Sequence, residues 1–152
     1  MRRPAPDLTQ REYGLWGSSH DWSSKIASAS AGRGGGSVAT KIARAFLAEI
    51  ASSEPTSRTL FHGTTTRRGA EPRLGESIHL PLIALSDDED VARDFARGGG
   101  KEMILRFQRG TPAMRYTDIE WITAGAFRVA GVEEERDPFW GTALLVVTLE
   151  AR

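Results

Sequence analysis

The sequence predicts an α+β domain built on a mostly antiparallel β-sheet. Three features support this fold class: an amphipathic helical pattern at residues 37–52, a series of short β-like runs separated by turn-rich segments, and one short helix that interrupts the series. With 152 residues the chain can bury one hydrophobic core. We therefore expect a single functional site.

The first regular element is expected at residues 37–52. Ser37 can cap a helix N-terminus, and the apolar residues behind it recur at steps of three and four. The segment SSEPTS at residues 52–57 then ends the helix.

Residues 1–37, before that helix, are expected to form an arm or linker that is partly docked on a domain of residues 38–152. Their segment SSKIASASAGRGGGS is rich in Gly, Ser and Ala and has little apolar periodicity. One cluster stands out from this composition, namely Tyr13, Leu15, Trp16 and Trp22. These side chains either dock the arm onto the domain or form a lid or a partner surface.

The β-like runs are expected at 59–62, 77–85, 103–107, 119–123, 127–132 and 142–149. Turn-rich segments separate them, including AGA at residues 124–126.

The interrupting helix is expected to start in the segment SDDE. Ser86 would be its N-cap, Glu89 would occupy the capping-box position, and RGGG would stop it. Its inward face is expected to consist of Val91, Ala92, Phe95 and Ala96.

Composition narrows the class of function. Twenty basic and twenty acidic side chains cancel, so no global charge favours nucleic acid or an acidic membrane as a partner. The absence of cysteine excludes disulfides, a thiol nucleophile and thiolate metal ligands. The three histidines lack metal-ligand spacing, so we expect no metal.

The N-terminal MRRPAP is not followed by an apolar stretch, and no run of eighteen apolar residues occurs. We therefore expect a soluble cytoplasmic protein, or a delivered effector, without a conventional export signal.

Two carboxylates lie two residues apart in the segment YTDIEWITAGAFRVAGVE. If residues 119–123 form a strand, Asp118 and Glu120 point to the same face and repel each other. They are either solvated residues opposite a buried face of Ile119 and Trp121, or part of a cleft that stabilises positive charge.

The order of these motifs resembles that of NAD-dependent ADP-ribosyltransferases over roughly residues 38–150. The resemblance rests on a strand ending in FHGT, the segment GESIHLPLIALS before VARDFA, an MILRF strand, and DIE before FRVAGVE. It implies a split, mostly antiparallel sheet with an N-terminal amphipathic helix and one short inserted helix.

Three positions depart from the toxin-like branch of this family, which has an arginine-ended strand, a Ser-Thr-Ser strand and Glu-x-Glu. Where the toxin-like branch has the arginine, this chain has His62. Its HGT motif is similar to that of the poly(ADP-ribose) polymerases and the rifamycin-modifying transferases. At the second it has Ala84-Leu85-Ser86, so the serine that usually steadies the catalytic glutamate is absent. At the third it has Asp118-Ile119-Glu120.

The resemblance implies that NAD binds between the FHG strand end and the DIE strand. The residues it assigns to NAD are His62, Gly63, Thr64, Ser86 and Phe95. His62 would bond the adenosine ribose, the Gly63 backbone would meet the nicotinamide amide, and Phe95 would stack on the ring. Each also has an ordinary structural alternative, such as a strand end, a helix cap or a core residue.

The resemblance further implies a mono-ADP-ribosyltransferase that breaks the nicotinamide–ribose bond. Glu120 would counter the positive charge of the transition state, and Asp118 would orient or deprotonate the acceptor. Tyr116 and Trp121 flank this pair, where the fold usually recognises its target. An NAD glycohydrolase and an inactive NAD- or ADP-ribose-binding module are the alternatives.

The identity of the partner stays open at this stage. The acceptor can be a protein side chain, a nucleic acid or a small molecule, and an antitoxin or activator is possible, whereas a membrane partner is not expected.

Overall fold

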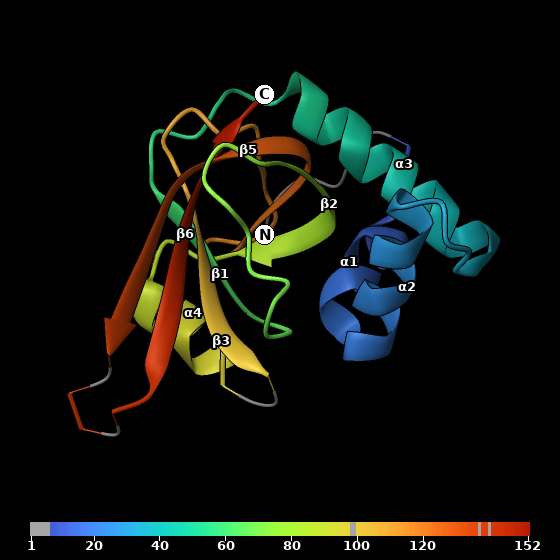
Figure 1. Cartoon of the computed structure of the whole chain (residues 1–152). Coiled ribbons are helices and arrows are strands. Elements are labelled where there is room, and N and C mark those ends of the chain that lie inside the picture. Colours follow the sequence, from blue (N-terminus) through green and yellow to red (C-terminus); the bar gives the residue numbers. More distant parts are fainter. Residues whose placement is uncertain (1–6, 98–99, 137, 140) are drawn as a thin grey trace. The chain divides into compact units, whose positions relative to one another are not determined.

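The computed structural model describes residues 7–97, 100–136, 138–139 and 141–152 (Figure 1). The helices of this part are α1 (Gln10–Ser18), α2 (His20–Ser30), α3 (Gly36–Ser52) and α4 (Glu89–Phe95). The strands are β1 (Leu60–Thr66), β2 (Ser77–Leu85), β3 (Lys101–Phe107), β4 (Met114–Arg115), β5 (Trp121–Arg136) and β6 (Ala143–Ala151). The predicted α+β class is confirmed.

The strands pair in the order β1-β3-β6-β5-β2, and β4 pairs with the first residues of β5. Strand β1 is antiparallel to β3, and β5 is antiparallel to β6. The β3–β6 pair is parallel, with Leu105 opposite Val147. The sheet is therefore mostly antiparallel, as predicted, and the sequence does not indicate the parallel β3–β6 pair.

The chain divides into two compact units, which we describe separately. The first, called the helical unit, comprises Met1–Glu54, Leu80–Ala84 and Pro112–Gly125. The second, called the sheet unit, comprises Pro55–His79, Leu85–Thr111 and Ala126–Arg152.

In the helical unit, α1, α2 and α3 pack side by side around an apolar core (Figure 1). Phe46 of α3 is fully buried, and its ring centroid lies 5.9 Å from that of Tyr13 and 6.1 Å from that of Trp16. Leu15 and Trp22 pack against the same core.

Within residues 1–37, for which the sequence predicts a partly docked arm or linker, α1 and α2 are regular helices. Both helices are capped: the Thr9 side chain accepts from the Glu12 N–H in a capping box, and the Ser19 side chain accepts from the Trp22 N–H. Caps and buried aromatic rings together outweigh the low helix propensity of the Gly- and Ser-rich composition.

Helix α3 begins one residue before the predicted start, but Ser37 is not its cap. The N-cap is Gly35, which has a φ of 102° and makes no side-chain cap hydrogen bond. A Cβ at Gly35 would lie 3.3 Å from the carbonyl carbon of Lys25 and overlap its oxygen. The close approach of α2 therefore requires glycine here.

In the sheet unit, α4 packs on β1 through a single small-residue face. Ala92 and Ala96 are buried, whereas Val91 and Phe95 are 40% and 75% exposed. Val91 and Phe95 are thus not part of the inward face that the sequence predicts. The reason is Gly63: a Cβ there would overlap the Ala92 carbonyl oxygen and stand 2.7 Å from its carbon. Because the backbone of α4 lies so close to β1, only side chains as small as alanine fit between the helix and the strand.

The predicted start of α4 at Ser86 is also wrong. The N-cap is Asp88, whose side chain accepts from the Asp90 N–H at 2.9 Å. Ser86 instead pairs with Phe61 through two backbone hydrogen bonds of 2.7 and 2.9 Å, and its hydroxyl accepts from the Asp88 N–H. Because this pairing keeps Ser86 extended, the helix cap lies two residues later than predicted.

Several strand boundaries also differ from the prediction, and those of β5 and β1 affect candidate residues. Residues 121–136 form one strand, β5, in place of two strands separated by a turn at AGA. Asp118 and Glu120 precede this strand, so they do not share a strand face, and Ile119 is 76% exposed rather than buried. Strand β1 extends to Thr66, which places Thr64 in a strand.

We expect Gly63→Ala to lower the free energy of unfolding by about 3 kcal/mol, because the new methyl group would force α4 away from β1. Gly131→Ala is the matched control, since a Cβ there meets Thr148 at an ordinary 3.5 Å. Urea denaturation of both variants measures the difference. Equal stability of the two variants would contradict the close contact of α4 with Gly63.

Candidate functional site

The candidate residues fall into two sets, one in each unit. Asp118 and Glu120 belong to the helical unit. The five residues assigned to NAD, His62, Gly63, Thr64, Ser86 and Phe95, belong to the sheet unit.

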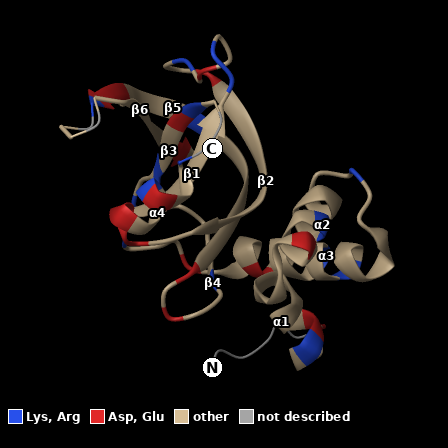
Figure 2. Cartoon of the chain, turned by 90° about the horizontal axis from the view of Figure 1, so that it is seen from below, with Lys and Arg blue, Asp and Glu red and all other residues tan. Residues whose placement is uncertain are grey.

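Asp118 and Glu120 lie in a short loop between β4 and β5, where Figure 2 shows acidic residues. The Tyr116 and Thr117 N–H groups both donate to the Glu120 carbonyl oxygen, at 2.9 and 3.1 Å. The Arg115 guanidinium donates to the Asp118 carbonyl oxygen at 2.8 Å and lies 5.0 Å from the Trp121 ring. These bonds close the loop on itself and fix its backbone.

Glu120 has a half-buried carboxylate that is held by one specific donor. The Trp16 indole Nε1–H donates to Glu120 Oε2 at 2.8 Å. Burial raises the pKa of Glu120, and the hydrogen bond from Trp16 opposes this by lowering it. A charge held in such a place acts strongly on a nearby cation, because little water screens it.

Tyr116 fastens the start of the loop to α1. Its hydroxyl donates to the Tyr13 carbonyl oxygen at 2.8 Å, and the Tyr13 hydroxyl donates to the Tyr116 carbonyl oxygen at 3.0 Å. Burial raises the pKa of Tyr116, and the charge of Glu120 adds to the increase, while a hydrogen bond from Gly17 opposes it. Tyr116 and Trp121 are both buried, so they are core residues of the helical unit.

Two side chains at the tip of the loop face solvent. Asp118 is exposed, and Ile119 is 76% exposed. The loop thus combines one half-buried carboxylate with one accessible carboxylate beside an apolar side chain. A half-buried acid can stabilise a developing cation, and an exposed one can meet a molecule that arrives from solution.

The sheet unit brings its candidate residues together around β1. Ser86 pairs with Phe61, the residue before His62, and α4 packs over Gly63. His62 lies opposite Leu105 of β3 and is half-buried, as is Thr64. Phe95 presents a ring that is 75% exposed.

The backbone of Gly63 points to the outer edge of β1. Strand β1 is the first strand in the order, with β3 on one side. Phe61 directs its N–H and C=O to Ser86 on the other side, and a strand repeats this direction every second residue. The Gly63 N–H and C=O therefore face that edge too, one donor beside one acceptor, which suits a planar carboxamide.

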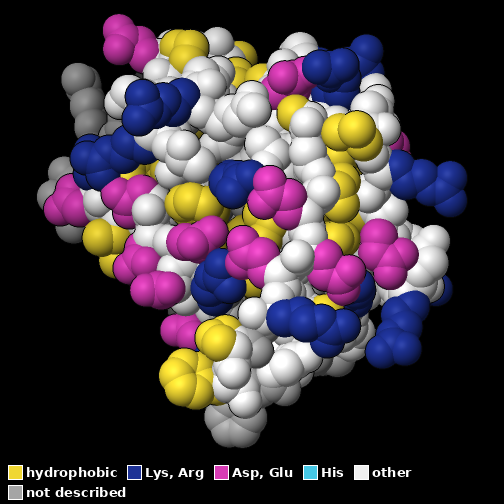
Figure 3. All heavy atoms as spheres, turned by 60° about the vertical axis from the view of Figure 1, so that its left-hand side comes forward, with side chains coloured by type: hydrophobic (Ala, Val, Ile, Leu, Met, Phe, Trp, Pro, Cys, Tyr) yellow, Lys and Arg dark blue, Asp and Glu magenta, His cyan; other side chains and the backbone are white. Residues whose placement is uncertain are grey.

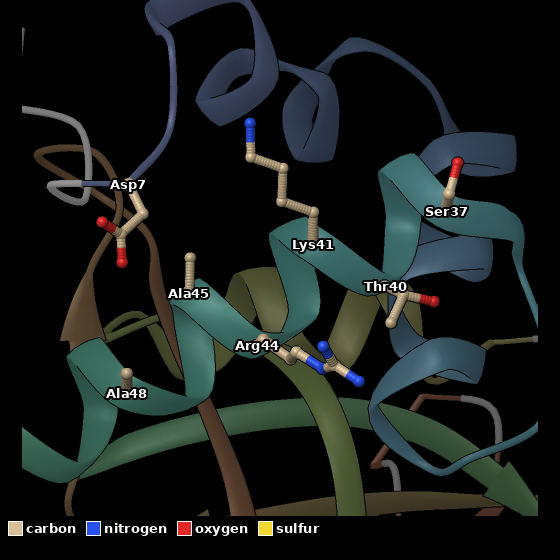
Figure 4. A pocket seen from close by; sticks show the side chains of 7 residues that line it. All are labelled: Asp7, Ser37, Thr40, Lys41, Arg44, Ala45 and Ala48. Atoms are coloured by element: carbon tan, nitrogen blue, oxygen red, sulfur yellow. The ribbon is translucent and has the colours of Figure 1, made fainter.

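A pocket of about 470 Å³ lies elsewhere in the helical unit (Figure 4). Its lining is Asp7, Ser37, Thr40, Lys41, Arg44, Ala45 and Ala48. It contains none of the candidate residues, and the Lys41 ammonium is bonded to both Glu12 carboxylate oxygens, at 3.0 and 2.9 Å. We assign it no ligand.

Charged side chains on the sheet unit are interleaved rather than gathered by sign. Arg93 bonds Glu135 at 2.7 Å, and Lys101 bonds Glu134 at 3.2 Å. Figure 3 shows one face of the molecule, on which acidic and basic side chains alternate. This arrangement agrees with the neutral net charge.

Comparison with known proteins identifies the fold. No family model and no curated protein matches the chain. Solved ADP-ribosyltransferase toxins do match, so the chain has the ADP-ribosyltransferase fold that the motif order suggests.

Three of these structures illustrate the likeness. The Vis toxin of Vibrio splendidus is 12% identical with a TM-score of 0.67, covering 94% of this chain and 73% of the toxin. Exoenzyme S of Pseudomonas aeruginosa, solved with human 14-3-3 protein beta and carba-NAD, is 17% identical with a TM-score of 0.61, covering 94% and 75%. Plx2a of Paenibacillus larvae is 13% identical with a TM-score of 0.63, covering 94% and 86%.

The sequence does not predict the contact of Trp16 with Glu120. It predicts a docked arm, a lid or a partner surface for the aromatic cluster, although Tyr13, Trp16 and Gly17 share one helix face at steps of three and four. That spacing is the available signal, but it does not reveal which residues the face meets.

The raised pKa of Glu120 makes stability depend on pH in a defined direction. The folded chain holds the Glu120 proton more tightly than the unfolded chain does, so this contribution is full below the unfolded pKa and is lost as pH rises through the folded pKa. Glu120→Gln removes the charge and keeps an oxygen that can accept from Trp16.

We therefore expect Glu120→Gln to gain stability relative to wild type as pH rises above about 4, the pKa of an unfolded glutamate. Urea denaturation at several pH values measures this trend, with Asp118→Asn as the control for loss of an exposed carboxylate. A gain that is equally large for Asp118→Asn would show that burial of Glu120 is not the cause.

Proposed function

We propose that this protein is a mono-ADP-ribosyltransferase that splits NAD at the nicotinamide–ribose bond. The observation that carries the proposal is Glu120, a half-buried carboxylate held by the Trp16 N–H in a chain with the ADP-ribosyltransferase fold. Because the three structural neighbours described above are at most 17% identical, their likeness supports the fold, and the activity rests on these residues.

The chemistry requires one fixed negative charge. As the bond from ribose C1′ to the pyridinium nitrogen breaks, its electron pair leaves with nicotinamide, which becomes neutral. Positive charge develops on the ribose, as in glycoside hydrolysis. We assign Glu120 to counter this charge and to hold the ribose 2′-hydroxyl. Its half-buried environment strengthens the interaction relative to bulk water.

Asp118 is assigned to the acceptor. Its exposed carboxylate lies next to the exposed Ile119, on a loop whose backbone is fixed by hydrogen bonds. An acceptor nucleophile that attacks C1′ releases a proton, and Asp118 takes it or orients the nucleophile. The pair thus separates two tasks, one acid for the bond that breaks and one for the bond that forms.

NAD recognition is assigned to the sheet unit. The Gly63 N–H and C=O would bond the nicotinamide carboxamide, and the exposed ring of Phe95 would stack on the nicotinamide ring. His62 would bond the adenosine ribose hydroxyls, with Thr64 and Ser86 as further polar contacts. The pairing of Ser86 with Phe61 brings Ser86 next to this part of β1.

Two alternatives use the same fold. An NAD glycohydrolase would pass ADP-ribose to water, and a binding module would hold NAD or ADP-ribose without cleaving it. His62 and Ala84, which replace the arginine and serine of the toxin-like branch, motivate both alternatives.

No helix among the described residues is long and apolar enough to cross a membrane.

Acceptor and partners follow the toxin-like class in this proposal. The neighbours include a Vis structure with agmatine and an exoenzyme S structure with 14-3-3 protein beta. We propose a protein or small-molecule acceptor, and an activator or antitoxin can be sought by co-purification from the native cell.

We expect His62→Ala to weaken NAD binding by at least about tenfold, because a hydrogen-bonding side chain is lost from the site. His79→Ala is the matched control, since His79 is an exposed residue of β2. Calorimetry with NAD measures both affinities. Equal affinities would remove His62 from the site.

We expect Glu120→Gln to reduce nicotinamide release by at least about 100-fold while NAD affinity changes little, because the charge matters only in the transition state. Asp118→Asn should lower ADP-ribose transfer more than hydrolysis of NAD by water. The assay is nicotinamide release and acceptor labelling from labelled NAD in a cell lysate, with and without nuclease.

The same assay separates the alternatives. Nicotinamide release without labelling of any acceptor indicates a glycohydrolase, and NAD binding without release indicates a binding module. Wild-type release by Glu120→Gln would contradict the role of Glu120.

A further inference from the structure

Helix α1 presents one face to the loop that carries Glu120. The Tyr13 hydroxyl, the Trp16 Nε1–H and the Gly17 N–H all lie on this face and all donate into the loop or its start. Gly17 also lies close to the loop, because a Cβ there would be 3.3 Å from the Tyr116 ring and the ring would have to shift by a few tenths of an ångström. The face is thus fitted to the loop by shape as well as by hydrogen bonds.

Trp16 is held more rigidly than an ordinary surface donor. Its side chain is 5% exposed, and its ring packs edge-on against Phe46, with centroids 6.1 Å apart. The capping box at Thr9 and Glu12 fixes the start of its helix. A buried ring in a capped helix loses little additional freedom when it bonds, so its N–H is preorganised.

The chemistry of the indole nitrogen favours the charged form of its partner, because a hydrogen bond to an ionised oxygen is stronger than one to a neutral carboxyl group. It is a donor and never an acceptor, so it can bond a carboxylate oxygen but cannot accept a proton from a carboxylic acid. A donor of this kind also binds one oxygen only. Glu120 Oε2 is committed to Trp16 at 2.8 Å.

We propose that Trp16 is the positioning residue that orients the Glu120 carboxylate for NAD cleavage. It takes the role that the family resemblance gives to a serine on a neighbouring strand, where this chain has Ala84. Ala84 packs against the same apolar core as Trp16 and brings no hydroxyl. The inference rests on the proposed function. With Oε2 bound to Trp16, Oε1 is the oxygen that meets the ribose 2′-hydroxyl.

The other polar groups near this contact play different parts. Tyr116 keeps its proton over the range in which a carboxyl ionises, because burial raises its pKa above its ordinary value. Arg115 donates to backbone carbonyl oxygens of Thr117 and Asp118, and the Asp118 side chain is exposed. Trp16 is the donor that the structure shows on the Glu120 carboxylate itself.

The test is Trp16→Phe, which keeps an aromatic ring beside Phe46 and removes the N–H. We expect kcat for nicotinamide release to fall by at least about tenfold while KM for NAD changes less than about twofold. The acid limb of the pH–rate profile should move to higher pH, because the lost hydrogen bond favours the ionised form of Glu120. A purely structural role would not move that limb.

Trp22→Phe is the matched control, because it makes the same chemical change on α2, where the indole lies beside Lys25. It should leave kcat and the pH profile as in wild type. An unchanged kcat and pH profile in folded Trp16→Phe would overturn the proposal.

A second measurement does not depend on activity. In an NMR titration of wild type, the Trp16 indole N–H signal should shift with the ionisation of Glu120, and this shift should vanish in Glu120→Gln. A titrating signal without nicotinamide release would retain the contact and reject the enzymatic function. A signal that does not titrate would reject the contact itself.

Discussion

A carboxylate that is removed from water needs a hydrogen-bond donor, and the arrangement of the helical unit depends on this requirement. Glu120 obtains its donor from Trp16, which is 104 residues away in the chain. The hydrogen bond between Trp16 and Glu120 forms only if α1 is stable, if packing fixes the position of the Trp16 ring, and if hydrogen bonds fix the backbone of the loop. The Thr9 capping box, the buried Phe46 ring and the bonds to the Glu120 carbonyl oxygen meet these three conditions.

A second constraint acts at Gly63, where two requirements coincide without conflict. Its missing Cβ lets the Ala92 carbonyl of α4 approach β1, and its N–H and C=O face the outer strand edge. In a strand the Cβ direction is perpendicular to the direction of the hydrogen-bonding groups. Gly63 can therefore serve both helix packing and ligand recognition. A substitution of Gly63 has to be tested for its effect on stability and for its effect on binding.

The elements that the sequence predicts well are those whose signal is local. The bounds of β2 agree with the predicted 77–85, and α3 differs by one residue, because each has a clear periodicity bounded by turn residues. The errors have physical causes. Gly125 takes a φ of 114° inside β5, so a glycine that suggests a turn is accommodated within a strand. Pairing with Phe61 keeps Ser86 extended, which moves the helix cap to Asp88.

The candidate site shows the same division between local and distant signals. The motif order identifies Glu120 and the FHGT strand, because these are short local patterns. Local sequence patterns do not predict the contact of Trp16 with Glu120, because an aromatic residue in a Gly- and Ser-rich segment does not indicate which distant residue it will contact. The chain has Ala84 where the family resemblance expects a serine, and the structure shows the Trp16 indole N–H as a hydrogen-bond donor to the Glu120 carboxylate.

Charge balance limits the long-range attraction of a charged partner to this protein. The chain has no net charge, and the ion pairs of Arg93 and Lys101 neutralise acidic side chains of β5. Figure 3 shows the resulting mixture of signs on one face. Long-range attraction of a charged partner is therefore weak, since it grows with surplus charge of one sign. Under the proposed function, selection of an acceptor would then rest on short-range contacts. The fixed loop offers such a contact in the exposed Ile119, beside the exposed carboxylate of Asp118.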